Sequence, residues 1–363
     1  MHVVHRDVFR EKGAFAGWPA NYGLWAWNHE VLSVFAVGTI GEKAEIHELN
    51  RHRPFAPHQA RSLDGGEKWI SEPFTGRVPG GRSLSADEHL DSDRKMRPRL
   101  DSDADLQYIN RPIDFLDPET IVMCARTGLS EDSVSWFYVS RTRGRRWRGP
   151  FAFRGLNLPL AARTDIVALG RHRALFMLTT AKTNGDEGRV FCARTRNGGL
   201  DFEFVGFVGD EPSGYRIMPS SAVLPNGHVV TAVRCSGKSD DRGWIEAYLS
   251  KDEGRSWTSL GIAVDNTGSG GNPPALLRLE NDRLIVVHGY RDAPFGIRMR
   301  SSGDGGSSWS DDITLRADGG TPDLGYPRIA RAGDNHLIVV YYYNDGEGKE
   351  RYIAATRIEI SEI

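Results

Sequence analysis

Positively charged residues stand at matching places near the ends of successive apolar segments. Four such segments end in a cation, at Arg126, Lys182, Arg234 and Arg291. Other segments begin near an arginine, at Arg111, Arg163 and Arg328. Because a guanidinium fork can bind two oxygens of one carboxylate, sulfate or phosphate, these cations predict an anion site if the fold gathers them at one opening. Alternatively, they pair with nearby acids such as Asp114, Asp165 and Asp292 and only fasten loops.

Four residues near these cations are candidates for catalysis or for contact with a ligand. Tyr326 could be a nucleophile or an acid/base if a neighbouring cation or base lowers the pKa of its phenol; otherwise its ring only fills the channel. Asp165 is a candidate acid or base, or a partner of Arg163. His47 could transfer protons near neutral pH, or be an ordinary loop residue. Trp18 could offer a face to a sugar ring, or belong to the core.

A repeated motif indicates which elements must position these residues. The pattern S-x-D-x-G-x-x-W is complete at Ser62, Ser250 and Ser302, and weaker copies begin at Ser140 and Thr195. Its Ser, Asp and Gly residues suit a tight turn, and its aromatic residue suits burial as the next strand begins. The starts at 62, 140, 195, 250 and 302 are separated by 78, 55, 55 and 52 residues, which is the interval of a propeller blade.

The sequence therefore predicts an all-β protein that is a six-bladed β-propeller, with residues 1–363 as one domain. Each blade would have four strands; in the second, 111–115 would be the first strand. The N-terminal strand would complete the sixth blade and so close the ring. The longer first interval is explained by an inserted loop at 76–108, which has no apolar period and is either a lid or a surface excursion.

Composition restricts the partners. The net charge is −2, so no global field favours nucleic acid or a membrane surface, and no basic run is interleaved with aromatic residues. Three cysteines without C-x-x-C spacing argue against a disulfide framework, and no cofactor or metal is expected. The start of the chain lacks a signal peptide, which indicates a cytoplasmic protein or the mature form of an exported one. The oligomeric state is not predicted.

The repeated turn resembles the Asp-box of sialidases, and the chain from Phe15 onward is similar to the sialidase-like (neuraminidase, BNR-repeat) superfamily. The segments 15–23, 268–275 and 289–298 resemble a bacterial branch described as exo-α-sialidase-like glycosyl hydrolases. Sialidases use a tyrosine nucleophile assisted by a glutamate, an aspartate as acid/base, and three arginines that bind the substrate carboxylate. The resemblance implies Tyr326 as the nucleophile, Arg234 as the second arginine, and Arg291, or else Arg298, as the third.

Three expected members of that set are missing. The first arginine is absent from Gly17-Trp18-Pro19-Ala20, no acid stands in Arg216-Ile217-Met218-Pro219, and the loop after Val37 has no aspartate. The resemblance therefore predicts a glycosidase that removes a terminal acidic sugar, either sialic acid or another sugar carboxylate, from a glycan. Two alternatives stay open: a lyase that acts on uronate-containing glycans with the tyrosine as base, and a non-catalytic glycan-binding propeller.

Overall fold

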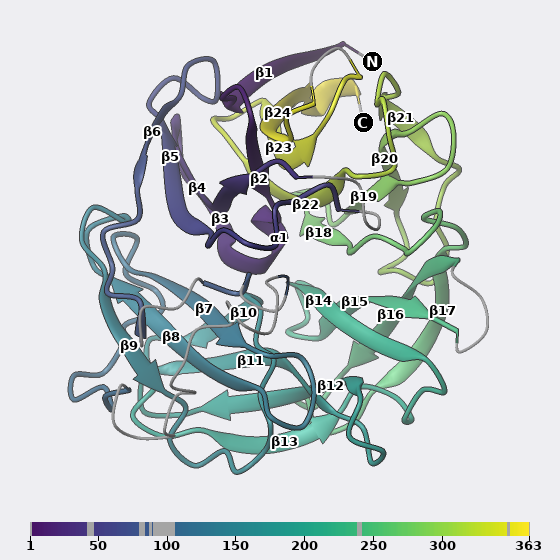
Figure 1. The fold of residues 1–363 in the computed structure, drawn as a ribbon. Coiled ribbons are helices and arrows are strands. Elements are labelled where there is room, and N and C mark those ends of the chain that lie inside the picture. Colours follow the sequence, from purple (N-terminus) through teal and green to yellow (C-terminus); the bar gives the residue numbers. More distant parts are fainter. Residues whose placement is uncertain are drawn as a thin grey trace.

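The structure of the protein is a computed structural model and describes residues 2–41, 47–79, 84–86, 89, 106–237, 242–346 and 349–362. Six antiparallel sheets are arranged as blades around a central channel (Figure 1). The chain is thus an all-β six-bladed propeller, as its repeat predicts. Most of the inserted loop expected at 76–108 lies outside the described residues.

The blades follow one another along the chain, and most run from an inner to an outer strand. The first three blades contain these strands: β2 (Ala14–Gly17), β3 (Gly23–Trp27), β4 (Glu30–Thr39), β5 (Ala56–Ser62) and β6 (Ile70–Pro73); β7 (Ile121–Thr127), β8 (Val134–Ser140) and β9 (Arg148–Ala152); β10 (Ile166–Gly170), β11 (Arg173–Ala181), β12 (Glu187–Thr195) and β13 (Glu203–Phe207).

The other three blades have four strands each: β14 (Tyr215–Val223), β15 (Val229–Ser236), β16 (Gly243–Ser250) and β17 (Thr258–Val264); β18 (Ala275–Arg278), β19 (Leu284–Tyr290), β20 (Gly296–Ser302) and β21 (Ile313–Arg316); β22 (Gly325–Arg331), β23 (His336–Tyr343) and β24 (Tyr352–Glu359) with β1 (Val3–Phe9). Strand β1 pairs antiparallel with β24. The chain's first strand therefore completes the blade that its last strands form.

Two blades depart from the four-strand scheme. In the first blade, β2 and β3 pair with different parts of β4, and the short helix α1 (Pro19–Tyr22) lies between them near the channel (Figure 1). In the part of the chain that the structure describes, the second blade has three strands and residues 111–115 form none of them, so the prediction of a first strand there is wrong. That segment runs instead beside the turns of the next blade, where Ile113 N–H donates to Gly198 and Phe115 N–H donates to Arg171.

The repeated motif forms one kind of turn, called here the box turn. In the copy that starts at Ser302, Gly306 N–H donates to Ser302 Oγ at 2.9 Å and Ser308 N–H donates to Asp304 Oδ1 at 2.9 Å. In the weaker copies Thr142 and Asn197 take the role of the aspartate, at 3.0 and 3.1 Å from the corresponding N–H groups. The turn needs a side-chain oxygen at this position rather than a charge.

The box turns provide a stability prediction. Ser302→Ala removes the acceptor of a buried backbone N–H and is expected to lower the free energy of unfolding by about 1–2 kcal/mol. Exposed Ser307 in the same turn is the control, because Ser307→Ala should change that free energy by less than about 0.5 kcal/mol. Urea denaturation followed by tryptophan fluorescence measures both. Equal effects would show that the hydrogen bond to Gly306 does not stabilise the fold.

Within the residues that the structure describes, no helix is long and apolar enough to cross a membrane.

Candidate active site

A cavity of about 130 Å³ lies at one mouth of the channel and is called here the Tyr326 cavity. Its lining side chains come from five of the six blades or the segments that precede them, and from the inserted loop. They are Asn21, His89, Arg126, Leu129, Arg163, Glu187, Tyr215, Ile217, Arg234 and Tyr326. Three arginines, one glutamate, one histidine and two tyrosines thus share a space of monosaccharide scale.

Tyr326 is held in an unusual backbone conformation at the start of β22. Its φ of 51° lies in the left-handed region, which a residue with a side chain rarely adopts. The amide side chain of buried Asn272 fixes this bend, because its Oδ1 accepts from Tyr326 N–H at 2.8 Å and its Nδ2 donates to Leu324 O at 3.0 Å. Such strain persists where the surroundings impose it, as they often do at functional sites.

The Tyr326 phenol is surrounded by positive charge. Arg234 Nη1 donates to its hydroxyl oxygen at 3.1 Å, and the guanidinium carbons of Arg234 and Arg291 lie 5.8 and 5.6 Å from its ring centroid. Burial alone would raise the pKa of Tyr326, but the charges of Arg234, Arg291 and Arg163 outweigh it and lower that pKa below its ordinary value. The phenolate of Tyr326 is therefore easier to form than that of a tyrosine in water.

Arg163 and Glu187 form a charged pair in the wall of the cavity. Arg163 Nη2 lies 3.0 Å from Glu187 Oε1, and Arg163 Nε donates to Asn21 Oδ1 at 3.2 Å. The remaining nitrogen, Nη1, is buried and has no acceptor in the described part of the chain. Because an unpaired buried donor costs free energy, this nitrogen suits an oxygen atom of a ligand.

His89 brings an imidazole to the same cavity. Its ring stacks on the indole of Trp18, with 4.4 Å between centroids and an interplanar angle of 17°. The ring of His47 meets both of these rings edge-on, at 5.4 Å from each. The rings of Trp18 and His47 therefore both pack against the ring of His89.

Arg291 does not line the Tyr326 cavity although its charge reaches the phenol. Its three nitrogens donate to Leu324 O at 3.2 Å, Gly271 O at 3.1 Å and Tyr342 Oη at 2.8 Å. The candidate role in binding a carboxylate is not supported by this placement, since the donors are used within the protein. Arg298 lies farther out, against the ring of Tyr290 and 3.1 Å from Asp312.

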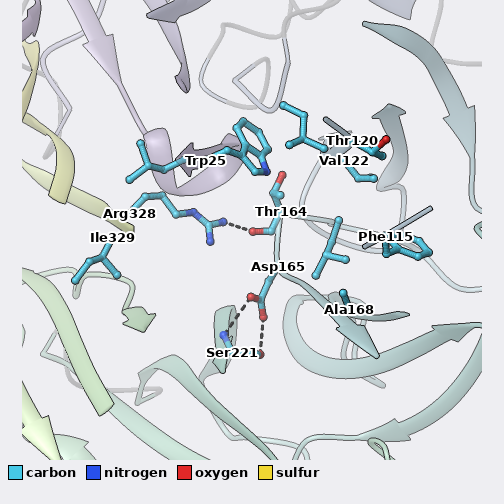
Figure 2. Close-up of a pocket in the computed structure, with 14 residues that line it drawn as sticks. Trp25, Phe115, Thr120, Val122, Thr164, Asp165, Ala168, Ser221, Arg328 and Ile329 are labelled. Carbon is cyan, nitrogen blue, oxygen red and sulfur yellow. Dashed lines mark hydrogen bonds between the residues drawn. The ribbon is translucent and has the colours of Figure 1, made fainter. Parts of the chain in front are cut away.

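Asp165 and Arg328 line a second cavity, called here the Asp165 cavity (Figure 2). Asp165 does not pair with Arg163; it accepts from the N–H and hydroxyl of Ser221 at 3.1 and 2.7 Å. Burial raises its pKa to about 6, although Ser221 and Arg328 oppose this shift. Arg328 donates to the carbonyl oxygens of Ala20 and Thr164. The structure thus separates both residues from the group around Tyr326.

The other candidates also lie outside the Tyr326 cavity. Trp18 is 1% exposed and offers no face to a sugar, because His89 covers it. His47 Nδ1 is bonded to Asp323 at 2.8 Å. Arg111 is exposed in the segment beside the third blade, and Lys182 is in the turn before β12. The expected ring of seven cations therefore reduces to Arg126, Arg163 and Arg234.

Sequence reasoning missed Glu187 and His89. Glu187 begins the third strand of its blade, whereas the candidate residues were taken from the ends of first and second strands. His89 belongs to a loop without periodicity. Three Xaa-Pro pairs, Trp18-Pro19, Met218-Pro219 and Tyr326-Pro327, each have a left-handed first residue, but they do not point to Glu187 or His89.

Carboxylates and imidazoles do not cluster as a metal site in the described ranges: no group of three His, Cys, Asp or Glu side chains there could hold an ion. The three cysteines are buried thiols.

Comparisons with known proteins agree with the architecture. No protein-family model matches the sequence, and no curated protein matches it. A Dyadobacter fermentans protein of unknown function is similar in structure, with a TM-score of 0.73, 21% identity and 99% of both chains covered.

Sialidases are also similar in structure. For the NanB sialidase of Streptococcus pneumoniae the TM-score is 0.62 at 11% identity, with 99% of this chain and 71% of that chain covered. For a leech intramolecular trans-sialidase the TM-score is 0.61 at 12% identity, with 99% and 70% covered. At these identities the likeness shows a sialidase-like fold and no more.

Proposed function

We propose that the protein is a glycosidase that removes a terminal acidic sugar from a glycan at the Tyr326 cavity. The observation that carries this proposal is the Tyr326 phenol, which faces the cavity, accepts a hydrogen bond from Arg234 and has a pKa lowered by three arginines. A phenolate next to an anion-binding guanidinium suits attack on the anomeric carbon of a sugar that carries a carboxylate. The sialidase-like fold supports this reading by analogy.

Each lining group has a role in the proposed reaction. Arg163 binds the substrate carboxylate through Nη1, and Glu187 keeps its guanidinium in place. The Tyr326 phenolate forms a bond to the anomeric carbon while the glycosidic C–O bond breaks, and the leaving oxygen takes a proton from a neighbouring acid. Water then attacks the anomeric carbon, returns a proton to that acid as its conjugate base, and releases the free sugar and the phenolate.

His89 is the acid in this proposal. The arginines of the cavity stay protonated and Glu187 is ion-paired as a carboxylate, whereas an imidazole can give and retake a proton near neutral pH. His89→Gln is expected to lower kcat/KM by about 10²–10³-fold for a substrate with an alkyl leaving group. The loss should be under about tenfold for a 4-nitrophenyl glycoside, whose leaving group needs no proton. Equal losses on both substrates would contradict the role.

The overall proposal is tested by incubating the protein with a panel of α-sialosides and β- and α-uronosides. Release of a free saturated acidic sugar supports hydrolysis. A product with a new C=C bond, which absorbs in the ultraviolet, would instead indicate a lyase in which Tyr326 removes the proton beside the carboxylate. If acidic sugars bind and none is cleaved, the propeller is a binding module and the catalytic proposal fails.

A further inference from the structure

The Asp165 cavity lies at the opposite end of the channel from the Tyr326 cavity. Strand β7 gives Val122 near its start to the Asp165 cavity and Arg126 near its end to the Tyr326 cavity. Four residues of strand span roughly 13 Å. Strand β22 likewise gives Ile329 to one and Tyr326 to the other. Arg328 donates to Ala20 O and to Thr164 O, and Figure 2 shows the second of these bonds. The two linings have no residue in common, so the two cavities are distinct.

Among the described residues the second blade has no inner strand, and this leaves room for the cavity. No described strand pairs with the inner edge of β7, and two of its N–H groups are satisfied by side chains: Cys124 N–H donates to Thr164 Oγ1 at 2.9 Å, and Arg126 N–H to Ser85 Oγ at 3.1 Å. Alternation along the strand turns the N–H and C=O of Val122 to the same edge. Neither group is hydrogen-bonded by another residue of the described chain.

The cavity combines polar and aromatic groups. Its volume is about 360 Å³, and its wall includes the indole of Trp25 and the ring of Phe115 (Figure 2). Asp165 and Arg328 supply one carboxylate and one guanidinium, and Arg328 Nε is buried with no acceptor among the described residues. Ala168 on β10 is exposed, so the cavity opens to solvent there.

We propose that the Asp165 cavity binds one neutral sugar unit, at a site separate from the proposed active site. Hydroxyl groups of a sugar both donate and accept, so they can pair with the N–H and C=O of Val122, with Asp165 and with Arg328. The C–H face of the ring packs on an aromatic side chain such as Trp25. A neutral ligand fits because one negative and one positive side chain already balance each other in the wall.

This inference does not depend on the proposed hydrolysis, and its test uses binding alone. The whole protein is titrated with D-glucose, D-galactose, D-mannose and N-acetyl-D-glucosamine, and binding is followed by saturation-transfer NMR. At least one sugar is expected to bind at a single site with a Kd in the millimolar range, on the order expected for so small a ligand. Absence of saturable binding by all four sugars would overturn the proposal.

Substitutions in and away from the cavity test where the sugar binds. Ala168→Trp fills the opening, and Trp25→Leu removes the indole from the wall; each is expected to weaken binding at least about tenfold. Ala317→Trp, on an exposed residue outside both cavities, is the control for an added indole. Tyr326→Phe should leave binding unchanged. Binding that survives both Ala168→Trp and Trp25→Leu, or that is lost in Tyr326→Phe, would place the sugar elsewhere and overturn the proposal.

Discussion

Tyr326→Phe is expected to lower kcat for cleavage of an acidic glycoside by about 10³-fold or more and to change KM little. The variant removes one oxygen atom, which is the atom that forms the bond to the sugar in the proposed reaction. The ring stays, so its packing against Tyr342 at 5.8 Å and against the two arginines is kept. Because the substrate carboxylate is bound by Arg163, ground-state binding should persist in the variant.

The control for this loss is Tyr290→Phe. Tyr290 also carries an arginine against its ring, Arg298, but lies outside the cavity, so cleavage should be unchanged. Acid-quenched wild-type protein should gain the mass of one sugar residue on the peptide that contains Tyr326. Retention of more than about a tenth of wild-type kcat by Tyr326→Phe would rule out the phenol as nucleophile.

The repeat allowed the architecture to be predicted from the sequence. The box turn recurs because each blade needs the same corner, and a corner depends on a few adjacent residues such as Ser302, Asp304 and Gly306. The exception is the second blade, where the described residues form no inner strand. Its segment 111–115 has the alternation of a strand, but it bonds to Gly198 and Arg171 of the third blade instead. Packing against the third blade determines this pairing, and the local sequence pattern cannot predict it.

The residues of the site could be predicted only in part, for a related reason. Arg163, Arg234 and Tyr326 lie in or near strand ends and line one cavity, and their role there stays a prediction. Arg328, only two residues after Tyr326, lies at the other cavity because the strand between them runs along the channel. The position of a residue in the repeat predicts its blade and roughly how far along the channel it lies. It does not predict which cavity the residue lines, because a shift of two residues along the strand changes the cavity.

Arg234→Gln is expected to lower kcat/KM by about 10²-fold, because the variant loses both a hydrogen bond to the Tyr326 oxygen and a positive charge beside it. The charge of Arg234 leads the causes that lower the pKa of Tyr326 against the effect of burial. Its removal raises that pKa, so a smaller fraction of Tyr326 is phenolate at neutral pH. On a 4-nitrophenyl glycoside, which needs no proton from His89, part of the lost rate should therefore return as the pH is raised.

The pH profile distinguishes the proposed role of Tyr326 from its opposite. On a 4-nitrophenyl glycoside, which needs no proton from His89, a nucleophile acts as the phenolate, so kcat/KM rises with pH through the pKa of Tyr326, and Arg234→Gln should move this ascending limb to higher pH. A phenol that donated a proton would act in its neutral form, so kcat/KM for this substrate would not rise through the pKa of Tyr326. Arg298→Gln, which removes an arginine outside the cavity, should not move the ascending limb. An ascending limb that keeps its position in Arg234→Gln would show that ionisation of Tyr326 does not control the reaction.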